Sequence, residues 1–217
     1  QPTAHASFVA SRVVFGDLDL AAGIPASTPI GTARFYDVNV RGISPVSADA
    51  IDDKSLLDAF TAVTRTAPDV RVFNCSFDNL PLESMDPVKQ RECLALVQDL
   101  DNFIFENDAL VIIAAGNSPP NTPPNPEYPE HFVDARWRLG PWARSFNALT
   151  CGSYVGSLYG TGGIAPLGWP SPFCRVGPGI AESLKPDFSA PGGNTTTDYA
   201  SAPSLGVWGV THTGSWE

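Results

Sequence analysis

The side chain with the most evident chemical use is that of Asn117, which follows the apolar stretch from Ala109 to Ala115. Such a continuous apolar run is typical of a strand that is buried on both faces of a parallel sheet. The small residues that end in Gly116 allow another backbone to come close. In open α/β sheets, ligands bind just past the carboxyl ends of the strands, which is where Asn117 is expected to lie. An amide there can donate an N–H to a ligand. The alternative is a plain buried strand followed by a loop whose Asn tolerates an unusual turn.

A second candidate for chemistry is His5, at the start of a predicted helix over residues 5–16 that ends at Gly16. His5, Val9 and Val13 recur every four residues and therefore share one face. The positive end of the helix dipole disfavours a charged imidazole, and a neutral imidazole is what a general base requires. The alternative is a surface or capping histidine.

The elements that must position these residues alternate along the chain. Apolar stripes predict helices from Asp52 or Asp53 to Pro68 and from Asp86-Pro87 to Asn107. Runs rich in β-branched and aromatic residues predict strands over 33–40, 70–77, 109–115 and 147–154, and a short extended piece over 184–194. Helix–strand alternation predicts right-handed crossovers and an α/β fold. We expect a mainly parallel sheet of about five strands, with His5 and Asn117 at its carboxyl edge. The proline-rich stretch 118–146 is expected to be a long loop.

Composition excludes several classes of protein. The 217 residues fit one large domain, and a net charge of −10 without a basic cluster argues against nucleic acid as a partner. No apolar run reaches membrane-spanning length, and no secretory signal is visible. The glycine-rich segment 160–163 lacks the ending of a phosphate loop, so a nucleotide-binding domain has little support.

The four cysteines are too scattered for a zinc motif: Cys75, Cys93, Cys151 and Cys174. They allow three disulfide pairings or four free thiols. Free thiols, which we slightly favour, suit a cytoplasmic protein rather than a secreted one.

Four segments, in this order, together resemble the subtilisin-like serine peptidases (subtilases). The segment 5–10 (His-Ala-Ser-Phe-Val-Ala) resembles the family's His-Gly-Thr-x-Val-Ala, and Asn74-Cys75-Ser76 its Asn-x-Ser strand end. The segment 114–117 (Ala-Ala-Gly-Asn) matches the oxyanion-hole motif. The segment 185–192 matches Lys-Pro-Asp-x-x-Ala-Pro-Gly. Each motif is weak or moderate alone, and their order makes the match specific.

The resemblance implies a three-layer subtilisin-like α/β fold and a serine endopeptidase acting on polypeptides. His5 would be the general base, and Asn117 would donate its amide N–H to the oxyanion of the tetrahedral intermediate. Phe77, Asp78 and Asn79 would border the substrate strand, and Ala115 and Gly116 would form a wall of the specificity pocket. The resemblance makes no cofactor certain and leaves calcium possible, because the calcium sites of the family lie largely in variable loops; no metal ligand is assigned here.

Departures from the family pattern shape the remaining expectations. Ala6 and Ser7 replace the family's Gly and Thr, only four residues precede His5, and Thr213–Glu217 lacks the serine motif. We therefore expect residues 1–217 to be a single-domain fragment of a subtilase that lacks the triad's Asp and Ser and is inactive alone. Such a fragment should self-associate, or fill its groove with its own tail at Trp208 or Trp216. The alternative function is a non-catalytic peptide-binding module on the same scaffold.

Overall fold

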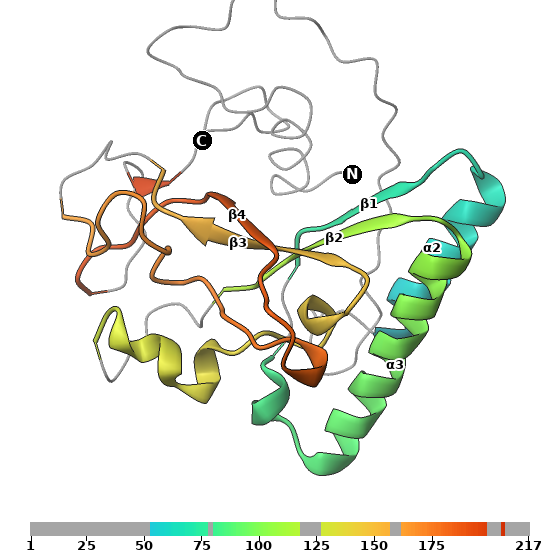
Figure 1. The fold of residues 1–217 in the computed structure, drawn as a ribbon, viewed down its shortest axis with the longest axis horizontal. Helices are drawn as coiled ribbons and strands as arrows, with labels where there is room; N and C mark the ends of the chain where they lie inside the picture. The colour runs from blue at the N-terminus through green and yellow to red at the C-terminus, as the bar shows by residue number, and fades with distance from the viewer. Residues whose placement is uncertain (1–52, 78–79, 118–126, 157–161, 199–204, 207–217) are drawn as a thin grey trace, which may run out of the picture. The chain divides into compact units, whose positions relative to one another are not determined.

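A four-stranded parallel sheet forms the centre of the described part of the protein. The computed structural model describes residues 53–77, 80–117, 127–156, 162–198 and 205–206 (Figure 1). The strands are β1 (Val72–Cys75), β2 (Leu110–Ala114), β3 (Leu149–Tyr154) and β4 (Phe188–Pro191), in the spatial order β1-β2-β3-β4. The predicted fold class, α/β with a mainly parallel sheet, is confirmed. The predicted helix 5–16 and strand 33–40 lie outside the described residues.

The chain divides into two compact units. Residues 40–205 form one unit and hold nearly all of the described residues. The other unit, 1–39 with 206–217, lies outside the described residues except for Gly206. The single-domain arrangement expected from the sequence stays a prediction.

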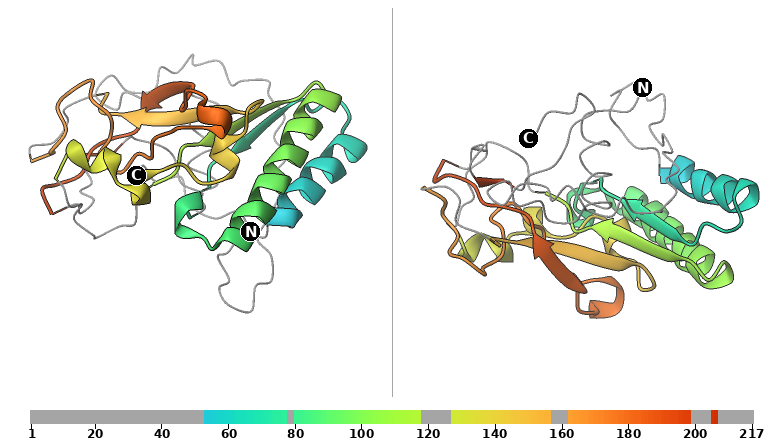
Figure 2. Two further views of the ribbon diagram at one scale, coloured as in Figure 1. Left: turned by 60° about the horizontal axis from the view of Figure 1, so that its bottom comes forward. Right: turned by 90° about the horizontal axis from the view of Figure 1, so that it is seen from above.

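Two long helices lie side by side against the β1–β2 half of the sheet (Figure 2). They are α2 (Asp53–Thr66) and α3 (Pro87–Glu106). Helix α3 begins where the sequence predicts, because the Asp86 side chain accepts hydrogen bonds from the backbone N–H groups of Val88 and Lys89 at 2.9 and 3.0 Å. Pro87 at the first helical position loses no intrahelical bond. Helix α3 lies between the parallel strands β1 and β2 in the chain and connects them.

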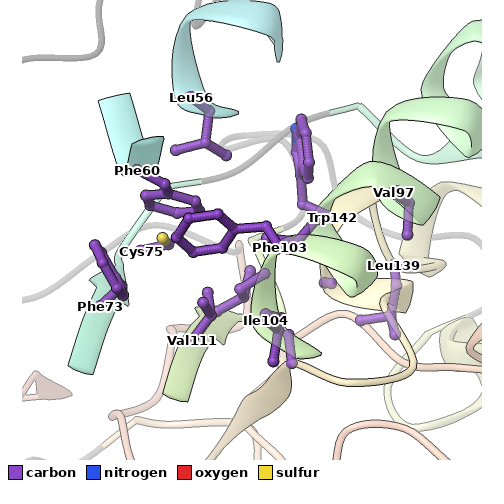
Figure 3. Packing of buried hydrophobic residues seen from close by; sticks show 14 of the residues in the cluster. Leu56, Phe60, Phe73, Cys75, Val97, Phe103, Ile104, Val111, Leu139 and Trp142 are labelled. Atoms are coloured by element: carbon purple, nitrogen blue, oxygen red, sulfur yellow. The ribbon is translucent and has the colours of Figure 1, made fainter. Parts of the chain in front are cut away.

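The core lies between these helices and one face of the sheet. Three phenyl rings meet there, Phe60 of α2, Phe73 of β1 and Phe103 of α3, with centroids 4.9 to 5.8 Å apart (Figure 3). Such aromatic pairs add about 0.5–1.5 kcal/mol each beyond the burial of their area. Val111 and Ile113 of β2 are 0% and 1% exposed beneath them. The helices are thus fixed to the two strands whose carboxyl ends carry the candidate site.

The opposite face of the sheet differs from the expectation of burial on both faces. Val72, Leu110, Leu149 and Phe188 are all partly exposed, between 37% and 59%. The burial of β1 and β2 alternates for this reason, with every second residue buried. A sheet is buried on both faces only when a layer of helices or loops covers each face. Within the described ranges, the helices α2 and α3 pack into the core on one face only.

The stretch 118–146, expected to be a loop, contains three short 3₁₀ helices in its described part. They are η2 (Glu130–Val133), η3 (Ala135–Trp137) and η4 (Trp142–Arg144). Two further 3₁₀ turns occur elsewhere among the described residues, η1 (Leu82–Ser84) and η5 (Ile180–Glu182). Isolated 3₁₀ turns have no long apolar period, so the sequence gives little sign of them.

Charged side chains hold the starts of β3 and β4. The Lys185 ammonium, 2% exposed, donates to the Ala148 carbonyl at 2.7 Å and to Asp187 at 2.6 Å. Asp187 also accepts the Thr150 backbone N–H at 2.6 Å. Burial alone would raise the pKa of Asp187, but these hydrogen bonds and the Lys185 charge outweigh it and hold the pKa below its usual value. The Lys-Pro-Asp motif is therefore a structural clamp.

Candidate active site

The candidate site begins where β2 leaves the sheet. Ala115 still donates its backbone N–H to Cys151 of β3 at 2.8 Å. Gly116 then turns with φ of 94°, a conformation that side chains other than glycine rarely adopt. The turn leaves Asn117 exposed just past the carboxyl end of the strand. An exposed primary amide at this position can donate an N–H to an anionic oxygen.

A second segment holds this turn by its backbone. The Gly116 carbonyl accepts the Arg175 backbone N–H at 3.2 Å, and Asn117 forms an isolated antiparallel bridge with Cys174. The Cys174 sulfur accepts the Ser153 backbone N–H at 3.2 Å. Cys174 therefore ties the end of β3 to the turn that carries Asn117.

The clamping segment is itself braced by an aromatic cluster. The Pro172 carbonyl accepts hydrogen bonds from His131 Nε2 at 2.9 Å and from Trp137 Nε1 at 3.2 Å. His131 is fully buried, and burial lowers its pKa, only partly offset by hydrogen bonds to the backbone of Pro172 and Glu127. The imidazole is thus neutral near pH 7. It braces the segment, a role that the sequence analysis did not predict.

A small cavity lies beside the same turn. It occupies about 10 Å³ and is lined by residues from the ends of β1 and β2 and from the segment around η4: Phe77, Ile113, Ala114, Ala115, Gly140, Trp142 and Ala143. Two predicted site residues, Phe77 and Ala115, therefore face one cavity, and Gly116 and Asn117 follow directly in the chain. Asp78, Asn79 and His5 lie outside the described residues. Their predicted roles stay predictions.

Sequence reasoning missed the floor of this cavity, formed by Gly140, Trp142 and Ala143. One local signal was available, since Gly140 to Ala143 form an uncharged Gly-Pro-Trp-Ala run inside a stretch that carries many charges. This signal predicts that the run is buried, but it does not identify the residues against which the run packs. The partner follows only from the fold.

The cysteines are free thiols in the structure, as the sequence slightly favours. Burial raises the pKa of Cys75 to about 12 and that of Cys174 to about 11, and it also raises the pKa of Cys151. Since the thiolate is the reactive form, these three groups are poor nucleophiles at neutral pH. A cysteine-based hydrolytic site therefore gains no support from them.

The described ranges show neither a grouping of metal-ligating side chains nor a membrane-spanning helix. They contain no cluster of three or more His, Cys, Asp or Glu side chains arranged to hold a metal ion. No helix among them combines the length and the apolar character needed to cross a bilayer.

The fold and the position of Asn117 define an α/β protein with a candidate anion-stabilising amide at the carboxyl edge of its sheet. Comparison with known proteins makes the assignment specific. The Peptidase S8 family model, which describes the subtilase family, matches residues 2–215. The chain therefore belongs to the subtilase family, a family of serine peptidases, as its four motifs predict.

One curated relative is 31% identical over 135 residues, the uncharacterized protein y4bN of Sinorhizobium fredii (strain NBRC 101917 / NGR234). The aligned region covers 52% of this chain and 31% of that protein, so the chain spans about a third of the relative's length.

Among solved structures, similarity extends to a lanthipeptide protease at 18% identity with a TM-score of 0.49, covering 76% of this chain and 40% of that one. The prenylagaramide maturation protease PagA aligns at 15% identity with a TM-score of 0.49, over 100% of this chain and 58% of PagA. The epidermin leader peptide processing serine protease EpiP of Staphylococcus aureus aligns at 15% identity with a TM-score of 0.44, covering 79% and 40%.

Proposed function

We propose that the full-length protein to which residues 1–217 belong hydrolyses peptide bonds as a subtilisin-type serine endopeptidase, with Asn117 as a donor to the oxyanion, and that residues 1–217 alone are inactive. The observation that carries the proposal is the exposed Asn117 amide at the end of β2, on a turn fixed by Arg175 and Cys174, in a chain of the subtilase family. A donor held in place before the reaction stabilises the negative charge that develops on the carbonyl oxygen in the transition state.

The substrate backbone runs between the ends of β1 and β2 in this proposal. Phe77 lies on one side, with Asp78 and Asn79 next to it in the chain, and Ala115 and Gly116 lie on the other. Parallel strands that end at the same edge leave such a gap, and the cavity beside Ala115 supports it. In this arrangement, the substrate residue whose carbonyl oxygen accepts the Asn117 hydrogen bond directs its side chain toward that cavity.

The remaining chemistry requires a base and a nucleophile. His5 takes the proton of a serine hydroxyl as its oxygen attacks the peptide carbonyl, and it returns that proton to the leaving amine. An aspartate orients the imidazole. Neither the aspartate nor the nucleophilic serine is assigned to a residue of this sequence.

Replacing Asn117 by alanine in the full-length protein tests the role of this amide. We expect kcat to fall roughly 100- to 1000-fold, the loss known for a member of this family, with little change in KM. Asn147→Ala is the matched control, because Asn147 is exposed and lies just before β3, at the opposite edge of the sheet. A kcat for Asn117→Ala that equals the control's contradicts the assignment.

A further inference from the structure

The cavity between Phe77 and Ala115 is too small for most side chains. We propose that it admits only the side chain of glycine, alanine or serine, so that the protein cleaves polypeptides after small residues. This inference rests on the proposed peptidase function and adds its substrate class.

The volume sets the limit. A cavity of about 10 Å³ holds roughly one water molecule. A methyl or hydroxymethyl group is of similar size, whereas the side chain of leucine adds three further carbon atoms. Forcing extra methylene groups into a packed site is unfavourable because neighbouring atoms must be displaced. A larger side chain is therefore excluded unless the walls move.

Much of the lining of the cavity is part of the hydrophobic core. Trp142 and Ile113 are 3% and 1% exposed, and Trp142 packs in the cluster of Figure 3. Phe77 is half-buried and packs against the same cluster. Moving Trp142 or Ile113 outward would open contacts throughout the core, so Phe77 is the wall whose removal changes the cavity with the least disturbance.

The floor is fixed as firmly as the walls. The Ala143 carbonyl accepts the hydroxyl of the fully buried Thr150 at 2.6 Å. The next residue, Arg144, donates from Nε to the Leu139 carbonyl at 3.0 Å and pairs with both Glu83 oxygens at 2.6 Å. These bonds tie η4 to β3, which follows it closely in the chain, and to η1, which lies 61 residues earlier. The floor consequently cannot retreat to admit a larger group.

The experiment compares Phe77→Ala with the wild-type full-length protein on peptides that differ only in the residue before the cleaved bond: Gly, Ala, Ser, Val, Leu or Phe. We expect the wild type to favour alanine over leucine by at least about tenfold in kcat/KM. Phe77→Ala should reduce or reverse that ratio. Phe105→Ala is the matched control, since Phe105 is 83% exposed on α3, and it should keep the wild-type ratio.

Equal cleavage after alanine and leucine by the wild type, or an unchanged ratio in Phe77→Ala, overturns the size restriction and leaves the peptidase function standing. If no peptide is cleaved, the proposed function fails instead. Binding of peptides that end in alanine or leucine, followed by tryptophan fluorescence, then decides the size restriction separately, and equal affinities overturn it. Should Phe77→Ala not fold, Phe77→Val enlarges the cavity while it keeps an apolar side chain.

Discussion

The two edges of the sheet are held in different ways. At the amino edge, charged side chains fix the starts of the strands through the Lys185–Asp187 pair and Asp101, which accepts the Ser145 hydroxyl at 2.5 Å and the Asn147 backbone N–H at 2.9 Å. At the carboxyl edge, the turn with Gly116 and Asn117 is held by backbone hydrogen bonds, a backbone bridge and the Cys174 sulfur.

The difference has a consequence for function. Backbone contacts hold the carboxyl edge in place and leave the Asn117 amide exposed at the site. The Lys185–Asp187 pair and Asp101 are placed at the other edge, where they do not compete with a developing negative charge. We therefore expect substitutions at the amino edge to change the free energy of unfolding and substitutions at the carboxyl edge to change turnover.

The largest effect on stability is expected at Lys185. Lys185→Met keeps the length of the side chain but leaves the Ala148 carbonyl and Asp187 without their buried ammonium. Because the Asp187 side chain is 31% exposed, the loss is that of hydrogen bonds to a charged group, about 1.5–3 kcal/mol in the free energy of unfolding, measured by urea denaturation. Lys89→Met is the control, because Lys89 is exposed and lies 3.9 Å from Glu92, and its effect should be near zero. Similar losses in both variants would contradict the clamp.

A smaller effect is expected at Thr150, whose hydroxyl connects the two edges by holding Ala143 beneath the cavity. Thr150→Val preserves the shape but leaves a buried carbonyl without its donor, at a cost of about 1–3 kcal/mol. Because the cavity floor loosens, the preference for alanine over leucine should also weaken. Thr61→Val, on the exposed side of α2, is the control. An unchanged free energy of unfolding and an unchanged preference for alanine in Thr150→Val would contradict this role of the Thr150 hydroxyl.

The smallest effect concerns pH. The pKa of Asp187 is lowered in the folded protein, so its ionised form contributes stability above its unfolded pKa of about 4. That contribution is lost as the pH falls through the lower, folded pKa. The difference in unfolding free energy between the wild type and Asp187→Asn should thus be largest at neutral pH and shrink below about pH 4. A difference that is constant or grows in acid would contradict this role.

The sequence predicts the parts of the fold that local physics determines. The start of α3 follows from the Asp86 cap and Pro87, and β2 follows from its apolar run. The segment 184–194 was predicted only as an extended piece, because its pairing with β3 depends on residues far away in the chain.

Some residues of the candidate site could likewise be predicted from local sequence, and others could not. Phe77, Ala115, Gly116 and Asn117 could be nominated because short motifs carry them. The cavity floor could not, since its position depends on the pairing of Arg144 with Glu83, 61 residues earlier. The brace at His131 likewise requires the Pro172 carbonyl, 41 residues later. Contacts of this range leave no periodic trace in a single sequence.

The most direct test of the central claim is hydrolysis of an unstructured protein by the full-length protein, with and without a serine-directed covalent inhibitor. The account predicts turnover that the inhibitor abolishes, with one inhibitor molecule bound per active site and cleavage after small residues. Peptide binding without any turnover would contradict it, and would favour a peptide-binding module on a subtilase scaffold.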